Sequence, residues 1–262
     1  MKILKIFLYD EPSVPELKVD ELCKFVQDTF SVPVEKRKNI FSLANEKTAS
    51  KLASCRIFNT RKPFETHSPT KEEIEFELAT FYDSKKTENI VMYDGFEFQR
   101  IVSELISDYE TTLDKLHIVF TNKLTCTYDD SDYRYHGRAV ICSNPAIIST
   151  TGIVEAPAKP RGYYLELISN VVQGVNVETM KKKYQGTYLE YNDKRFSAVS
   201  EGYVLQVIFY YLTGEAFCES RECRLNNAHW QSDLLYSQLE KGKLCGKHQK
   251  VLEQLSTLYN NP

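Results

Sequence analysis

Cysteine and histidine are the side chains of this chain with the clearest capacity for chemistry, and they gather near its C-terminus. Their spacing is Cys218-x4-Cys223-x21-Cys245-x2-His248, which places three of the seven cysteines in one short stretch. Thiolate and imidazole are the ligands that tetrahedral zinc prefers, and two close pairs joined by a long loop are typical of structural zinc sites. Four protein ligands leave no position for a water molecule, so the pattern predicts one structural zinc.

The nitrogen ligand of this group has two candidates. His248 forms a Cys-x2-His knuckle with Cys245, whereas His229 lies beside Trp230 between the two cysteine pairs. We expect His248 to be the ligand and keep His229 as its rival. The alternative to a metal site is a set of ordinary buried or exposed thiols.

Composition narrows the class of protein. The chain has 262 residues, with 33 basic against 36 acidic side chains and a net charge of −3. Nucleic-acid-binding proteins usually carry a basic excess, so we expect no nucleic-acid partner. The exception would be a continuous basic face formed by four lysines near the C-terminus: Lys241, Lys243, Lys247 and Lys250.

Hydrophobic runs and isolated cysteines indicate where the protein resides. The most apolar run, residues 204–212, is too short to span a membrane, and the N-terminal segment resembles a strand more than a signal peptide. The remaining cysteines lie singly in apolar segments, as buried thiols do: Cys23, Cys55, Cys126 and Cys142. We therefore expect a cytoplasmic protein with no membrane partner.

The first 160 residues alternate between strand and helix patterns, which is typical of an α/β layer. Strands are expected at residues 3–8, 31–35, 90–93, 116–120 and 138–142, with one more extended segment at 147–154. Helices are expected at 19–30, at 45–53, from an N-cap at Ser68, and at 96–106. Residues 127–137, which are polar and rich in tyrosine, are expected to form a loop.

The segment Ala156-Pro157-Ala158-Lys159-Pro160 ends this pattern, because proline disfavours both helix and strand continuation. The remainder is mainly helical, with helices expected at 163–172, 177–184, 196–212, 228–239 and 247–258. We expect one domain over residues 1–262. Residues 1–160 would form an α/β part with a mixed sheet, and residues 161–262 a helical part closed by the zinc knuckle.

Two further polar groups are candidates for ligand contact. One group follows a run of aspartates and consists of Tyr135, His136 and Arg138. Closely spaced aspartates can bind calcium, but the EF-hand spacing is absent here, so we interpret the run as part of a solvated loop. In the expected helix 196–212, the polar residues Glu201, Gln206 and Tyr210 stand among apolar ones. Glu201 with His136 or His229 would make an acid/base pair, although a helix-flanking role for Glu201 is the simpler interpretation.

The residues around the cysteines resemble the archaemetzincins, a family of zinc metallopeptidases. The stretch Gly214-x2-Phe217-Cys218-x4-Cys223-x-Leu225, followed by Cys245-x2-His248, is similar to the end of that family's signature, H-E-x-x-H-x-x-G-x-x-H-C-x4-C-x-M and a later C-x-x-C. The resemblance implies a metzincin-like α/β fold in which the cysteines hold a structural zinc. It also implies an archaeal protein, and in that family the strand after the polar loop lies near the substrate cleft.

The departures from that signature bear on activity. Matched position by position, the three catalytic histidines correspond to Val207, Tyr211 and Phe217, and the catalytic glutamate to Ile208. Valine, isoleucine and phenylalanine bind no metal, and the metallopeptidase mechanism requires a zinc-polarised water with a base beside it. The methionine of the signature corresponds to Leu225, and His248 stands where the last cysteine would be.

These departures imply a relative that has lost the catalytic site, so we expect no catalytic residues. The expected function is non-catalytic binding or scaffolding for a peptide or protein partner. The alternative is an active hydrolase with a metal held by non-standard ligands, drawn from four side chains: His117, His136, His229 and Glu201.

Overall fold

A five-stranded mixed sheet forms the centre of the molecule in the computed structural model, which describes residues 2–82 and 90–260. Its strand order is β2-β1-β4-β8-β7, and only β7 runs antiparallel to its neighbour. The strands are β1 (Lys5–Tyr9), β2 (Val34–Arg37), β4 (Lys115–Thr121), β7 (Val140–Ile141) and β8 (Ala146–Ser149). The mixed α/β class expected for the first half is confirmed.

A second, three-stranded sheet extends the first. Its order is β3-β5-β6, built from β3 (Met92–Asp94), β5 (Leu124–Asp129) and β6 (Arg134–Gly137). The loop expected at 127–137 is therefore wrong, because most of these residues pair across the antiparallel β5–β6 hairpin. The aspartates occupy the hairpin end, where Oδ1 of Asp129 accepts hydrogen bonds from the amide and hydroxyl of Ser131.

The central strands β1 and β4 are buried on both faces, as parallel strands usually are. Successive side chains of β1 point to opposite faces, so Ile6 and Leu8 join one hydrophobic core while Phe7 and Tyr9 join the other. Both strands must therefore be covered by helices on each side.

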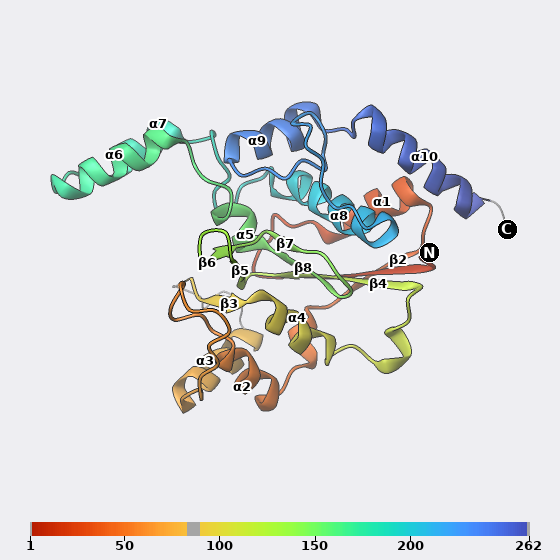
Figure 1. The fold of residues 1–262 in the computed structure, drawn as a ribbon, viewed down its shortest axis with the longest axis horizontal. Helices are drawn as coiled ribbons and strands as arrows, with labels where there is room; N and C mark the ends of the chain where they lie inside the picture. The colour runs from red at the N-terminus through yellow and green to blue at the C-terminus, as the bar shows by residue number, and fades with distance from the viewer. Residues whose placement is uncertain (1, 83–89, 261–262) are drawn as a thin grey trace.

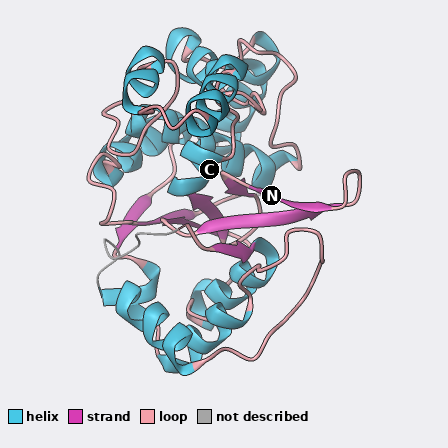
Figure 2. Ribbon diagram, turned by 90° about the vertical axis from the view of Figure 1, so that its left-hand side faces the viewer, coloured by secondary structure: helices cyan, strands magenta, loops and turns pink. Residues whose placement is uncertain are grey.

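Helices cover the two faces of the sheet as separate layers (Figures 1 and 2). The upper layer in Figure 1 contains α1 (Val19–Phe30), α5 (Thr150–Glu155), α8 (Phe196–Thr213), α9 (Gln231–Leu235) with the π-helical turn η4 (Tyr236–Lys241), and α10 (Gly246–Asn260). The lower layer contains α2 (Glu46–Ser54), α3 (Lys71–Tyr82) and α4 (Gly95–Ser103). Two short 3-10 turns connect this layer to the sheet along the chain: η1 (Ile40–Leu43) lies between β2 and α2, and η3 (Asp108–Glu110) lies between α4 and β4.

Two helices stand apart from both layers. α6 (Arg161–Val172) and α7 (Glu178–Tyr184) project from the body at the upper left of Figure 1. They follow the proline-containing segment that was expected to break the pattern, and this break is confirmed. Ala158 in that segment pairs with the chain around Trp230, since its amide donates to the His229 carbonyl.

Side-chain caps explain several helix starts and correct two expectations. Asn45 and Thr48 form a capping box at the start of α2. The cap of α3 is Thr70, which exchanges hydrogen bonds with Glu73, so the expected cap at Ser68 is wrong. Ser149 accepts from the amide of Gly152, which converts the second half of the expected extended segment 147–154 into α5.

Helix α8 is the centre of the upper layer. Twelve of its 18 residues are buried, which is expected for a helix that is apolar on nearly all sides. It ends at Gly214, whose φ of +81° is a left-handed conformation that glycine adopts without strain. This cap turns the chain toward the cysteine-rich segment. No helix in the described parts of the chain has the length and apolar character needed to cross a membrane.

A buried ion cluster ties the lower layer to the sheets. Glu77 of α3 is fully buried; its Oε1 accepts from Arg56 at 2.6 Å and from the Tyr93 hydroxyl at 2.7 Å, and its Oε2 from Lys123 at 2.7 Å. Burial, followed by the charge of Glu77, raises the pKa of Tyr93 well above its usual value. A buried charge is tolerated only with partners of this kind.

Replacing Glu77 by Gln should therefore destabilise the protein strongly. The change leaves the buried Lys123 ammonium without a counter-charge and Arg56 with Glu73 alone, at 3.7 Å, so we expect the free energy of unfolding to fall by about 3–5 kcal/mol. Urea denaturation measures it. Glu75→Gln on the same helix is the control: Glu75 forms only an exposed pair with Lys71 and should change stability by less than about 1 kcal/mol. Equal effects of the two variants would contradict the argument.

Candidate metal centre and adjoining groove

Four side chains from two separate segments converge beyond the end of α8. Cys218 and Cys223 lie in the loop that follows the Gly214 cap, whereas Cys245 immediately precedes α10 and His248 lies in its first turn. Their ligand atoms all lie within 4.8 Å of one another. Within the described residues, this is the one group of three or more cysteine, histidine or acidic side chains found in such an arrangement.

The distances within the group fit a tetrahedral zinc ion. Sγ of Cys218 is 3.9 Å from Sγ of Cys245, and Nδ1 of His248 is 3.5 Å from Sγ of Cys223 and 3.2 Å from Sγ of Cys245. Zinc bonds of about 2.3 Å to sulfur and about 2.0 Å to nitrogen place sulfurs about 3.8 Å apart and sulfur about 3.5 Å from nitrogen. The donor set and its spacing therefore match zinc.

Backbone amides around the group favour thiolate ligands. The amide of Ser220 donates to Sγ of Cys218, and that of Cys245 to Sγ of Cys223, each at 3.4 Å. The pKa of the Cys245 thiol is lowered: burial raises it, but hydrogen bonds from the amides of His248 and Lys247 and from the neighbouring cysteines outweigh burial. Burial raises the pKa of the Cys223 thiol to about 12, so this ligand needs the cation to lose its proton.

The loop that carries the first two cysteines is closed on itself. The amide of Cys218 donates to the Leu225 carbonyl, and the side-chain amide of Asn226 donates to the Cys218 carbonyl. Leu225 is buried in the upper core, and the His248 ring packs edge-on against Phe209 of α8. A metal bound here would connect α8, the loop and α10.

His229, the rival nitrogen ligand, lies elsewhere. It lines a groove of about 560 Å³ that runs between the edge strand β7 and helix α8. From α8 the groove is lined by Tyr203, Gln206 and Tyr210, which repeat at helical spacing. Gln206 and Tyr210 had been noticeable in the sequence as polar residues in an apolar helix, whereas nothing in the sequence paired them with β7.

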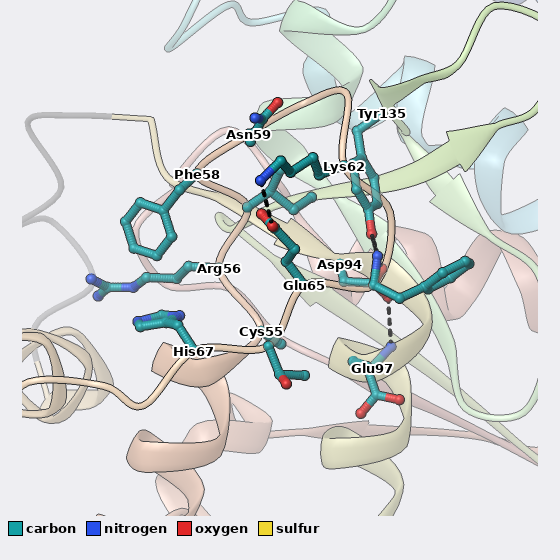
Figure 3. A pocket seen from close by; sticks show the side chains of 13 residues that line it. Cys55, Arg56, Phe58, Asn59, Lys62, Glu65, His67, Asp94, Glu97 and Tyr135 are labelled. Atoms are coloured by element: carbon teal, nitrogen blue, oxygen red, sulfur yellow. Dashed lines mark hydrogen bonds and ion pairs between the residues drawn. The ribbon is translucent and has the colours of Figure 1, made fainter.

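His136 and Arg138 also line this groove, but Tyr135 does not. His136 is held by Asp132, with Nε2 2.9 Å from Oδ1, and Arg138 donates from Nε to Thr127 at 2.7 Å. Tyr135 precedes His136 on β6, and successive strand residues point to opposite faces. Its hydroxyl donates to Asp94 at 2.7 Å inside a separate pocket of about 360 Å³ (Figure 3). The three expected ligand-contacting residues are therefore divided between two sites.

Glu201 and His117 do not reach the groove lining. Glu201 pairs with Arg224 at 2.8 Å, which separates it from the acid/base role considered with His136 or His229. His117 stacks on Phe7 in the lower core, accepts at Nδ1 from Tyr9, and donates from Nε2 to the Glu110 carbonyl. Burial lowers the pKa of His117, which favours the neutral ring that this arrangement requires.

The positions that correspond to the catalytic residues of the archaemetzincin signature are mostly turned away from the groove. Val207 and Ile208 are fully buried in the upper core. The Tyr211 hydroxyl donates to the Leu113 carbonyl at 2.9 Å and accepts from Asn144. Of these four positions, Phe217 alone lines the groove, with 45% of its surface exposed.

The chain belongs to the family described as the probable metallopeptidase family DUF6775, whose model matches residues 2–255. No curated protein matches it significantly. Among solved structures, it is similar to archaemetzincin from Methanopyrus kandleri, with 9% identity, a TM-score of 0.46, and coverage of 97% of this chain and 95% of that one. It is also similar to a zinc-dependent peptidase from Methanocorpusculum labreanum, with 11% identity, a TM-score of 0.44, and coverage of 95% and 99%.

Replacing one sulfur ligand should remove the metal and weaken the upper layer. For Cys218→Ser or Cys245→Ser, we expect loss of bound zinc and an unfolding temperature lower by roughly 10 °C, because a zinc ligand set contributes directly to folding energy. Elemental analysis and thermal denaturation measure the two effects. Cys23→Ser, in α1 outside the cluster, should retain both zinc and stability to within a few degrees. A Cys245→Ser protein with full zinc content would exclude this ligand set.

Proposed function

We propose that this chain is a zinc-stabilised, non-catalytic member of its metallopeptidase family, which binds an extended peptide or protein segment in the groove between β7 and α8. One structural zinc would be held by Cys218, Cys223, Cys245 and His248. The zinc would supply a cross-link between α8, the loop and α10. The observation that carries the proposal is the burial of Val207 and Ile208 where the signature has its first histidine and its glutamate.

The groove supports binding rather than hydrolysis. A metallopeptidase needs a metal with an open position and a base beside it. Glu201 is paired with Arg224 and does not line the groove, and His136 is bonded to Asp132 through Nε2, which leaves only its Nδ1 for a metal. Within the described residues, no second group of metal-binding side chains meets in the groove.

The shape and chemistry of the groove suit an extended peptide. Strand β7 is at the edge of the sheet, and Val140 and Ile141 line the groove, so a peptide could lie alongside the strand by β-augmentation. Phe217 and Tyr210 offer partly exposed rings on the opposite side. Arg138 and His136 add polar contacts at the end formed by the β5–β6 hairpin.

The basic residues near the C-terminus do not favour a nucleic acid as the partner. Lys241 pairs with Glu222 at 2.8 Å, and Lys247 pairs with Glu215 at 3.2 Å. Two of the four lysines that a basic face would need are thus partly neutralised. This leaves a peptide or protein segment as the partner that we propose.

Metal content and peptidase activity test the non-catalytic role together. Purified protein should contain close to one zinc per chain by elemental analysis and should not cleave fluorescein-labelled casein, with or without added zinc. An active zinc peptidase assayed in parallel controls for the method. A second, exchangeable zinc accompanied by chelator-sensitive cleavage would support the alternative of an active hydrolase.

Peptide binding to the groove can be followed through Trp230, the only tryptophan of the chain, which is adjacent to His229. We expect random unstructured decapeptides, screened by fluorescence polarisation, to include binders that also change Trp230 emission. The double variant Tyr210→Ala/Phe217→Ala should bind them at least about tenfold more weakly, because aromatic anchors dominate such contacts. Phe58→Ala removes a comparably exposed ring outside the groove and should bind normally. Equal affinities for both variants would place binding elsewhere.

A further inference from the structure

The arm formed by α6 and α7 is held together by a small core of its own. Tyr163 and Met180 are buried there with Tyr188, and Leu167, Val177 and Tyr184 pack against them. The Tyr184 hydroxyl donates to Glu166 at 2.7 Å, and Glu166 also pairs with Lys183. The inner face of α6 is therefore already satisfied by its own chain.

The outer face of α6 is apolar and uncovered. Five aliphatic side chains on it and in the following turn are 51–81% exposed: Leu165, Ile168, Val171, Val172 and Val175. At about 100° per residue, the four that lie in α6 fall, with Tyr164, within a stripe roughly 120° wide, and Val175 follows in the turn after the helix. A helix that is apolar on both faces is normally buried on both. Here only one face has a partner within the chain.

The size of the stripe approaches what a dimer needs. At roughly 80 Å² for each aliphatic side chain, the stripe offers about 400 Å² of apolar surface, within the range of the largest patch on a typical monomer, which is often functional. Two copies with Tyr164 and the flanking polar atoms would bury about 1,000 Å² in total, which is the range where specific interfaces begin.

The chemistry of the stripe distinguishes among partners. Interfaces between identical subunits are more apolar than those of transient complexes, and the stripe itself contains no charged residue. A membrane surface would require free cations beside the apolar face. Two of the three lysines of α7 are instead paired within the arm, Lys181 with Glu178 and Lys183 with Glu166.

We propose that the outer face of α6 is a homodimer interface, in which the α6 helices of two copies pack against each other across a two-fold axis, with α7 on the far side of each. A two-fold axis makes the interface self-complementary, so residues at its centre meet their own copies. Ile168 is near the middle of the stripe and would lie close to the axis. The dimer does not depend on the proposed groove function, because none of these residues belongs to the groove or the metal centre.

Sedimentation equilibrium of the full chain tests the dimer. We expect a mass twice the 30.4 kDa of one chain at micromolar concentration. Ile168→Glu/Val172→Glu should weaken association at least a hundredfold and give a monomer with unchanged zinc content and far-ultraviolet circular dichroism. Ser169→Glu, an exposed position on α6 outside the stripe, should remain dimeric. A wild-type monomer at 100 µM, or a dimer that survives the double substitution, would overturn the proposal.

Cross-linking tests the position of the axis without a destabilising charge. Under mild oxidation, Ile168→Cys should form a covalent dimer on a non-reducing gel, whereas Ser169→Cys should not. Equal cross-linking of both variants would overturn this arrangement. A membrane surface is the other partner that could cover the stripe, and sedimentation of the wild-type protein with vesicles of phosphatidylcholine and phosphatidylglycerol at 3:1 tests it. A monomeric protein that pellets with the vesicles would overturn the dimer and assign the stripe to a lipid surface.

Discussion

The burial of β1 and β4 on both faces is the constraint on which the rest of the structure depends. Their side chains alternate between two hydrophobic cores, and each core needs a layer of helices to exclude water. α1 and α8 supply the upper layer, and α2 with α4 the lower one. The groove follows from this arrangement, because the edge strand β7 and helix α8 meet where the upper layer stops covering the sheet.

The metal centre lies at the edge of the same layer and packs against its core. α8 is held by the core along most of its length, whereas residues 215–230, after Gly214, form a loop whose buried apolar side chains are Ala216, Cys223 and Leu225. Leu225 and the Cys218–Asn226 hydrogen bonds organise this loop, and the Cys/His group joins it to α10. A structural zinc is well suited to such a place, because its bonds supply folding energy where little apolar surface is available.

The two parts of the archaemetzincin-like signature, the positions that match its catalytic residues and the Cys/His group, have separate physical roles in this chain. The cysteines with His248 remain in a geometry that fits zinc, while Val207 and Ile208 contribute to the core. Apolar residues at these positions strengthen the contact between α8 and the sheet, which polar metal ligands would weaken. The proposed binding role agrees with this arrangement, because it needs a stable groove and no reactive metal.

Much of the fold was predictable from local patterns, because helix periodicity, caps and proline breaks act over a few residues. The helix at 19–30 has the predicted bounds, and the change to helical structure after Pro160 is observed. Predictions failed where distant segments decide the outcome. The hairpin at β5 and β6 depends on cross-strand pairing, and the start of α9 at Gln231 follows the pairing of Trp230 with Ala158.

The sequence by itself determined the donor set for a metal, since the spacing of the cysteines and His248 shows a suitable pair at each end of a loop. It also determined that the signature's histidines and glutamate are absent from the matching positions. Only the tertiary structure placed His229 in the groove and away from the thiols, divided Tyr135 and His136 between two pockets, and left one face of α6 uncovered. These outcomes depend on which surfaces meet when remote segments pack, and no local pattern encodes that contact.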